Sequence, residues 1–181
     1  PDKGKERLKS MIETRPDWCV SRQRVWGVPL PIFISKKDEK VLVDDEVFNN
    51  IANIFEKEGS DCWFENNKQK FLGKKYNEND FYQTTDIVEV WFDSGSTHSF
   101  VLEQRDDLKW PASLYLEGSD QHRGWFHSSL LESCGTRGEA PFEAILSHGF
   151  VVDGKGLKMS KSSGNVISPE DILKKYGADI L

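Results

Sequence analysis

The sequence predicts an α/β protein built around parallel strands. Two short apolar runs, Leu114–Leu116 and Ala144–Leu146, each end in glycine and polar residues, and a helical pattern that begins near Phe126 lies between them. Strand, helix and strand within about 40 residues form a βαβ unit, in which the two strands run parallel. A third observation is the change of composition over residues 36–85, which are rich in Asn, Lys, Asp and Glu and predict an insertion.

The first elements are a helix and an extended segment. The pattern predicts a helix over Lys3–Glu13 that ends at Arg15-Pro16, because a residue before proline is pushed out of the helical region. Val28–Ile34 is interrupted by two prolines and is therefore predicted to be extended but not a central strand.

Within the insertion, Asp45 is predicted to cap a helix that Gly59 ends. The apolar residues at helical spacing are Val47, Phe48, Ile51, Ile54 and Phe55. The polar remainder, including Asn66–Lys70 and Asn77–Asp80, is interpreted as solvated and without chemistry.

The last third of the chain is predicted to carry a binding site. The helix that follows the first strand should bury Phe126, Leu130, Leu131 and Cys134 on one face, and Gly135–Pro141 closes it. Ligands bind beyond the carboxyl ends of parallel strands. Glu117–Asp120 and His148–Phe150 should therefore share one rim, and the lysine-rich loop Lys158–Ser162 should converge with them on one pocket.

Composition limits the classes of function. With 37% hydrophobic residues the 181-residue chain can form a core, and a net charge of −6 argues against a general nucleic-acid coat. Cys19, Cys62 and Cys134 form no C-x-x-C pair, which argues against a disulfide framework and a zinc site and favours a reducing cytosol.

The sequence also allows three predictions, about membranes, metals and the ends of the chain. No apolar run approaches the roughly 18 residues of a membrane span, so no membrane partner is expected. The four histidines lack metal-ligand spacing, so no protein-bound metal is expected. Both ends interrupt structured-looking patterns, and we expect the chain to be a piece of a longer protein.

The segment Lys158-Met159-Ser160-Lys161-Ser162 lies between glycines at 154, 156 and 164. Two lysines on a flexible, hydroxyl-rich loop can close on a triphosphate as charge develops on its leaving group. The alternative is a solvated surface loop.

Three other motifs are open to two interpretations each. Glu117–Gln121 can hold an ammonium or hydroxyls, although Gly-x-Asp turns are common. The aromatic pair in Val90–Ser96 fits a binding pocket or simply a core. Arg22 and Arg24, within Trp18–Pro29, fit phosphate binding and base stacking or a structural turn about equally well.

Three of these segments resemble class I aminoacyl-tRNA synthetases. Lys158–Ser162 is similar to the family's signature loop, and Glu117–Phe126 resembles the strand-to-helix turn of the isoleucyl enzymes almost letter for letter. Trp18–Pro29 resembles the return from the editing insertion into the catalytic domain. The resemblance covers both ends of the chain well and the insertion poorly.

The resemblance implies roles for individual residues. Lys161, and second Lys158, would stabilise the departing pyrophosphate. The aminoacyl-adenylate would be bound by Glu117, Gly118, Asp120, Gln121, Trp91 and Trp125, with the two tryptophans walling the side-chain pocket. ATP would be bound by His148, Gly149, Phe150, Val151, Met159, Ser160 and Lys161.

The resemblance also implies a fold and an activity. The fold would be the second half of a Rossmann-like, doubly wound parallel sheet with a polar insertion, divided into residues 1–35 (helix and return segment), 36–85 (insertion), 86–153 (βαβ) and 154–181 (signature loop and helix). The enzyme would activate isoleucine with ATP, accompanied by Mg²⁺, and transfer it to tRNA. We expect a cytoplasmic monomer.

The chain departs from the family pattern because it contains no His-Ile-Gly-His-type motif. We therefore expect these 181 residues alone to be inactive. Alternatives are a valyl-tRNA synthetase, a non-catalytic binding module that retains the fold, and a small-molecule nucleotidyltransferase. The last would not share Trp91 and Trp125 or the segment Trp18–Pro29.

Overall fold

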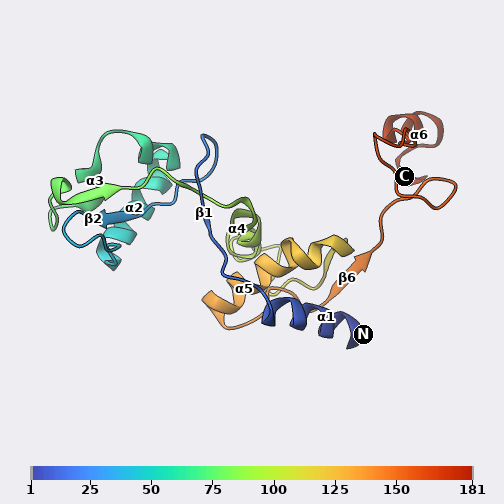
Figure 1. Ribbon diagram of the computed structural model, residues 1–181, viewed down its shortest axis with the longest axis horizontal. Helices are drawn as coiled ribbons and strands as arrows, with labels where there is room; N and C mark the ends of the chain where they lie inside the picture. Colours follow the sequence, from blue (N-terminus) through green and yellow to red (C-terminus); the bar gives the residue numbers. More distant parts are fainter. Residues whose placement is uncertain (1, 181) are drawn as a thin grey trace.

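The computed structural model describes residues 2–180, which are drawn out along one axis (Figure 1). One end carries a small module with β2, α2 and α3, the middle carries α1, α4 and α5, and the other end carries α6. The helical elements are α1 (Asp2–Glu13), α2 (Asp45–Glu58), η1 (Ser60–Phe64), α3 (Lys68–Leu72), η2 (Glu78–Asp80), α4 (Val90–Gly95), η3 (His98–Leu102), η4 (Ser119–Arg123), α5 (Trp125–Arg137), α6 (Pro169–Tyr176) and η5 (Ala178–Ile180).

The strands form three two-stranded sheets. The strands are β1 (Ser21–Arg22), β2 (Phe33–Ser35), β3 (Phe81–Gln83), β4 (Ile87–Val88), β5 (Tyr115–Gly118) and β6 (Ile145–His148). The pairs β1–β4 and β2–β3 are antiparallel, and β5–β6 is parallel with Gly118 opposite His148. The described residues thus form a mixed α/β structure with a small parallel sheet.

The predicted insertion, together with Phe33 just before it, contains a hydrophobic core. Trp63 lies at its centre, with its ring centroid 5.0 Å from those of Phe33 and Phe71. The buried members are Phe33, Val47, Ile51, Ile54, Cys62, Trp63, Phe71, Leu72 and Phe81. Asn66–Lys70 and Asn77–Asp80 are exposed or half-buried, as the prediction of solvated stretches requires. The prediction did not include the core around Trp63, because apolar residues scattered among Asn and Lys meet only after the chain has folded back on itself.

Polar side chains complete this module. Asn50 donates to the carbonyl oxygens of Lys70 and Phe71 at 2.9 and 2.8 Å, which ties α2 to α3. The cap of α2 is Asp44 and not Asp45: its extended backbone lets its carboxylate accept from the Glu46 and Val47 amides. Hydrogen bonds from Lys75 and Tyr76 lower the pKa of Asp44 to about 2. Gly59 ends the helix as predicted.

The βαβ unit forms as predicted, but α5 buries a different face. Its buried residues are Phe126, Ser128, Ser129 and Ser133, whereas Cys134 is exposed and both leucines are half-buried. The hydroxyl groups are satisfied, since Ser129 shares a 3.0 Å hydrogen bond with Tyr115 and Ser133 donates to the Glu139 carbonyl at 2.7 Å. Ser129 thus joins α5 to β5 through a hydroxyl group, and apolar periodicity did not reveal this polar face.

Candidate functional site

The two strand ends meet as predicted. Gly118 and His148 are partners in the parallel register, so the residues that follow β5 and β6 share one rim. A side chain at Gly118 would collide with Asp120, since its Cβ would lie 2.6 Å from Oδ1 of that carboxylate. Glycine at this position therefore leaves room for Asp120. The Glu117 carboxylate accepts from the Gly118 amide at 3.1 Å.

Gln121 joins the rim to α5. Its Nε2 donates to Asp120 at 3.2 Å, and its Oε1 accepts from the backbone amide of Trp125 at 2.9 Å. The amide side chain thereby satisfies one of the free N–H groups in the first turn of α5. Asp120 and Gln121 are held by this arrangement beside the strand end.

The two predicted pocket tryptophans have different surroundings. Trp125 stacks on Tyr115, with ring centroids 4.1 Å apart and planes within 5°, and its Nε1 donates to the Ser94 carbonyl at 3.0 Å. Trp91, on α4, is 42% exposed. Trp125 is therefore a packed residue that links α4 to α5, whereas Trp91 keeps an open face.

Glu89 connects α4 to the return segment. Its side chain is 7% exposed, accepts from the Trp91 amide at 3.0 Å and lies 3.7 Å from the guanidinium of Arg22. Arg22 also donates to the carbonyls of Cys19 and Ser21. These bonds favour the structural interpretation of Arg22. Trp26, in contrast, is 92% exposed at the tip of the same loop.

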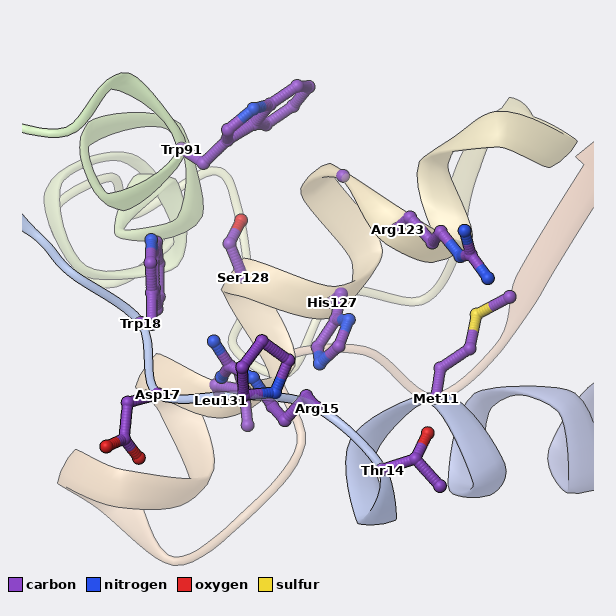
Figure 2. A pocket seen from close by; sticks show the side chains of 12 residues that line it. Met11, Thr14, Arg15, Asp17, Trp18, Trp91, Arg123, His127, Ser128 and Leu131 are labelled. Carbon is purple, nitrogen blue, oxygen red and sulfur yellow. The ribbon is translucent and has the colours of Figure 1, made fainter.

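A cavity of about 470 Å³ lies between α1, the segment after it and α5 (Figure 2). Figure 2 shows Met11 on α1 and Thr14 just after it, Trp18 beside α4, Trp91 on α4, and His127 extending from α5. The lining residues are Met11, Thr14, Arg15, Pro16, Asp17, Trp18, Trp91, Arg123, Gly124, His127, Ser128 and Leu131. Among them, Trp91 is the one residue predicted from the sequence as substrate-binding.

His127 is a feature of this cavity that the sequence did not reveal. Its Nε2 is buried and has no hydrogen-bond partner among residues 2–180. Burial, and secondarily the charge of Arg15, lowers the pKa of His127, so the ring is neutral at pH 7. Arg15 and His127 come from distant segments, and only the packing of the segment after α1 against α5 brings them together.

The lysine loop contacts the predicted rim only on the β6 side, where Lys158 lies over the Phe150 ring, and within residues 2–180 no hydrogen bond joins it to Glu117–Asp120. The predicted convergence of all three segments on one pocket is therefore not present in this structure. Figure 1 shows the chain after β6 leading away from α5 toward α6. The segment from His148 to Val151 is exposed. Within the described chain, the hydrogen bonds of the loop join residues between Asp153 and Asn165.

Asp153 and Asn165 organise the loop from either side. The Asp153 carboxylate accepts from the Lys155 and Leu157 amides and from Asn165 Nδ2 at 2.9 Å. These bonds, that of Asn165 first, lower the pKa of Asp153. Asn165 Oδ1 accepts from the Ser160 amide at 3.0 Å. The pentapeptide is therefore held in a defined shape, which is more than a solvated loop requires.

The family assignment follows from the whole chain. The sequence model of the tRNA synthetases class I (I, L, M and V) matches residues 1–181. The chain belongs to this family. It is 78% identical over its full length to an isoleucine–tRNA ligase of Pelagibacter ubique and 59% identical to one of Brucella melitensis. It spans 20% and 18% of the length of these two relatives.

A solved structure supports the fold of this synthetase segment. A LeuRS of Agrobacterium radiobacter K84, crystallised in a ternary complex with tRNA and LeuAMS, matches 95% of this chain and 25% of its own, with a TM-score of 0.61 and 21% identity. This likeness concerns the fold alone. Among residues 2–180, none of the synthetase segment's helices combines the length and apolar character needed to cross a bilayer. No group of three potential metal ligands occurs in the same range.

Proposed function

We propose that this chain is the second half of the catalytic domain of an isoleucine–tRNA ligase, on a Rossmann-like doubly wound sheet. The observation that carries the proposal is the 78% identity to such an enzyme across the entire chain. The geometry agrees with it, because a parallel strand pair presents Glu117, Gly118 and His148 on one rim. The enzyme would join isoleucine to ATP, release pyrophosphate and pass the aminoacyl group to tRNA.

The proposed roles follow the positions of the residues. Asp120 and Gln121, held next to the rim, would contact the aminoacyl-adenylate together with Glu117 and Gly118. Trp91 would present its exposed face to the isoleucine side chain, and Trp125 would support it from α5. The exposed backbone from His148 to Val151 would meet the adenine.

Catalysis would come from positioning and from charge stabilisation, since the isoleucine carboxylate is itself the nucleophile that attacks the α-phosphorus. Lys161 and Lys158 would neutralise the pyrophosphate as it leaves, with Met159 and Ser160 contacting ATP. Lys161 forms no ion pair within residues 2–180, so its ammonium is available for this task. Mg²⁺ would enter bound to ATP and not to a protein site.

The test is amino-acid-dependent exchange of pyrophosphate into ATP by the full-length protein that contains this chain. Isoleucine should support exchange with a kcat/KM at least about 100-fold above that of valine, which is the range that one methylene in a pocket provides. A preference for valine or leucine would assign the chain to a sibling enzyme. No exchange with any amino acid would favour a non-catalytic binding module.

A further inference from the structure

The outer edge of the Trp91 ring lies directly on the backbone of Gly124. A Cβ atom at position 124 would lie 3.0 Å from Cη2 and 3.2 Å from Cζ3 of Trp91. Ordinary van der Waals contact between carbon atoms begins at about 3.5 Å. Gly124 is buried and lines the same cavity as Trp91. A side chain at position 124 therefore requires the Trp91 ring to move by a few tenths of an ångström.

Trp91 has little freedom to move away from such a side chain. Its helix is held at the beginning by the bond from the Trp91 amide to Glu89 at 3.0 Å. The same helix is held near its end by the bond from Trp125 Nε1 to the Ser94 carbonyl at 3.0 Å. The second bond joins α4 to α5, whereas the first belongs to the cap of α4, whose Glu89 carboxylate also lies 3.7 Å from Arg22. To make room for a side chain at position 124, the ring would have to rotate or the α4–α5 contact would have to open.

Gln121 would be disturbed by the same atom. Its Oε1, which accepts from the Trp125 amide, is the atom nearest to the place that a Cβ at 124 would take and would overlap with that Cβ. The absence of a side chain at Gly124 thus allows two of the proposed substrate-binding residues to lie against one short piece of backbone.

We propose that Gly124 is a positioning residue that fixes the place of Trp91 and, through it, the shape of the pocket for the amino-acid side chain. The proposal rests on the proposed function and deepens it, because it names a residue that acts on amino-acid selectivity without touching the substrate. It separates Gly124 from the other glycine of this helical region: at Gly135 an added Cβ would meet nothing within 4 Å.

A double-mutant cycle in the full-length protein tests this coupling. The variants are Gly124→Ala, Trp91→Phe and their combination, with Gly135→Ala as the matched control. We expect Gly124→Ala to raise the KM for isoleucine about 10-fold or more and to shift the kcat/KM ratio of isoleucine over valine, with the KM for ATP unchanged. Gly135→Ala should behave as the wild type.

The cycle identifies the atoms responsible. Phenylalanine at position 91 lacks the outer indole atoms that approach position 124. The increase in the KM for isoleucine caused by Gly124→Ala should therefore be at least about threefold smaller in the Trp91→Phe background than in the wild type. Equal costs in both backgrounds would show that the effect passes through Gln121 or the backbone, and this would overturn the proposal. Should Gly124→Ala fail to fold, recovery of folding by Trp91→Phe supports the proposal and continued misfolding overturns it.

A ¹⁹F NMR measurement, which does not depend on enzyme activity, keeps the test of Gly124 separate from the test of the proposed function. The protein is labelled with 4-fluorotryptophan, whose fluorine is attached to neither of the two ring atoms nearest Gly124, and the ¹⁹F resonance of Trp91 is assigned from its loss in Trp91→Phe. Gly124→Ala should shift that resonance, whereas Gly135→Ala should leave it in place. If the Trp91 resonance does not shift in Gly124→Ala, the positioning role of Gly124 is overturned, and this holds for any amino acid that the enzyme activates. A shifted resonance in a protein that activates no isoleucine would refute the proposed function and the pocket assignment together.

Discussion

The Nζ atom of Lys158 lies 4.2 Å from the centre of the Phe150 ring, a cation–π contact between the lysine loop and the exposed segment after β6. Both lysines are exposed, but within residues 2–180 Lys161 makes no such contact with an aromatic ring. The two lysines therefore differ before any nucleotide binds. This difference gives an order to their proposed roles.

We expect Lys161→Ala to lower kcat for isoleucine activation about 100-fold or more, and Lys158→Ala to lower it less. Lys161 would act on charge that develops as pyrophosphate leaves, so the KM for isoleucine should change little. Pyrophosphate exchange measures both constants, and Lys155→Ala, an exposed lysine of the same segment, is the control. A rise in KM alone would indicate a clamp on bound ATP instead.

Asn165→Ala should loosen the lysine loop, because the Asn165 side chain bonds Asp153, the Ser160 amide and the Lys158 carbonyl. Hydrogen–deuterium exchange at the Ser160 amide should become faster, and kcat should fall with it. Ser162→Ala, which removes only a 3.2 Å contact between Ser162 and Ser160 hydroxyls, is the control. Unchanged exchange in Asn165→Ala would show that the backbone turns alone hold the loop.

The two tryptophans should respond differently to truncation. Trp91→Ala and Trp125→Ala should both raise the KM for isoleucine more than that for ATP, by roughly 10-fold for a lost apolar contact of about 1–3 kcal/mol. Only Trp125→Ala should also lower the melting temperature by several degrees, because it removes the stack on Tyr115 and the bond to Ser94. Circular dichroism provides the melting curves. Equal losses of isoleucine and ATP affinity would indicate general unfolding.

Stability should fall with rising pH through Glu132. Burial, and secondarily the charge of Asp93, raises the pKa of Glu132 from 4.5 to about 8, and its Oε1 has no partner within residues 2–180. Between these two values the folded state holds a proton that the unfolded state has released, so the free energy of unfolding decreases as pH rises. Burial, and secondarily the charge of Glu89, also raises the pKa of Asp93 and adds to the trend.

Glu132→Gln should remove most of this decrease, so that its melting temperature exceeds that of the wild type at pH 8 and the difference narrows toward pH 5. Thermal melts at several pH values compare it with Glu139→Gln, an exposed carboxylate just beyond α5. Parallel pH profiles for the wild type and Glu132→Gln would contradict the assignment to Glu132.

The sequence predicted those parts of the fold that depend on neighbouring residues. The βαβ unit and the end of α2 at Gly59 follow from local apolar runs and from glycine, and the structure contains both. The core around Trp63 and the cavity beside His127 join segments that are far apart, and no local period encodes them. The rim could be predicted because parallel strands align their carboxyl ends. The position of the lysine loop could not, because it depends on contacts with residues that are distant in the sequence.

The two segments that connect the Trp63 core to the rest of the chain, residues 21–30 and 86–88, run side by side. Leu30 donates to the Asp86 carbonyl at 2.9 Å, and Ser21 and Arg22 of β1 pair with Val88 and Ile87 of β4. Everything between Leu30 and Asp86 is thus a loop closed at its base, with a core of its own. Evolution can lengthen, shorten or replace this module while the backbone around Trp91 stays in register, so its sequence can diverge faster than that of the segments on either side.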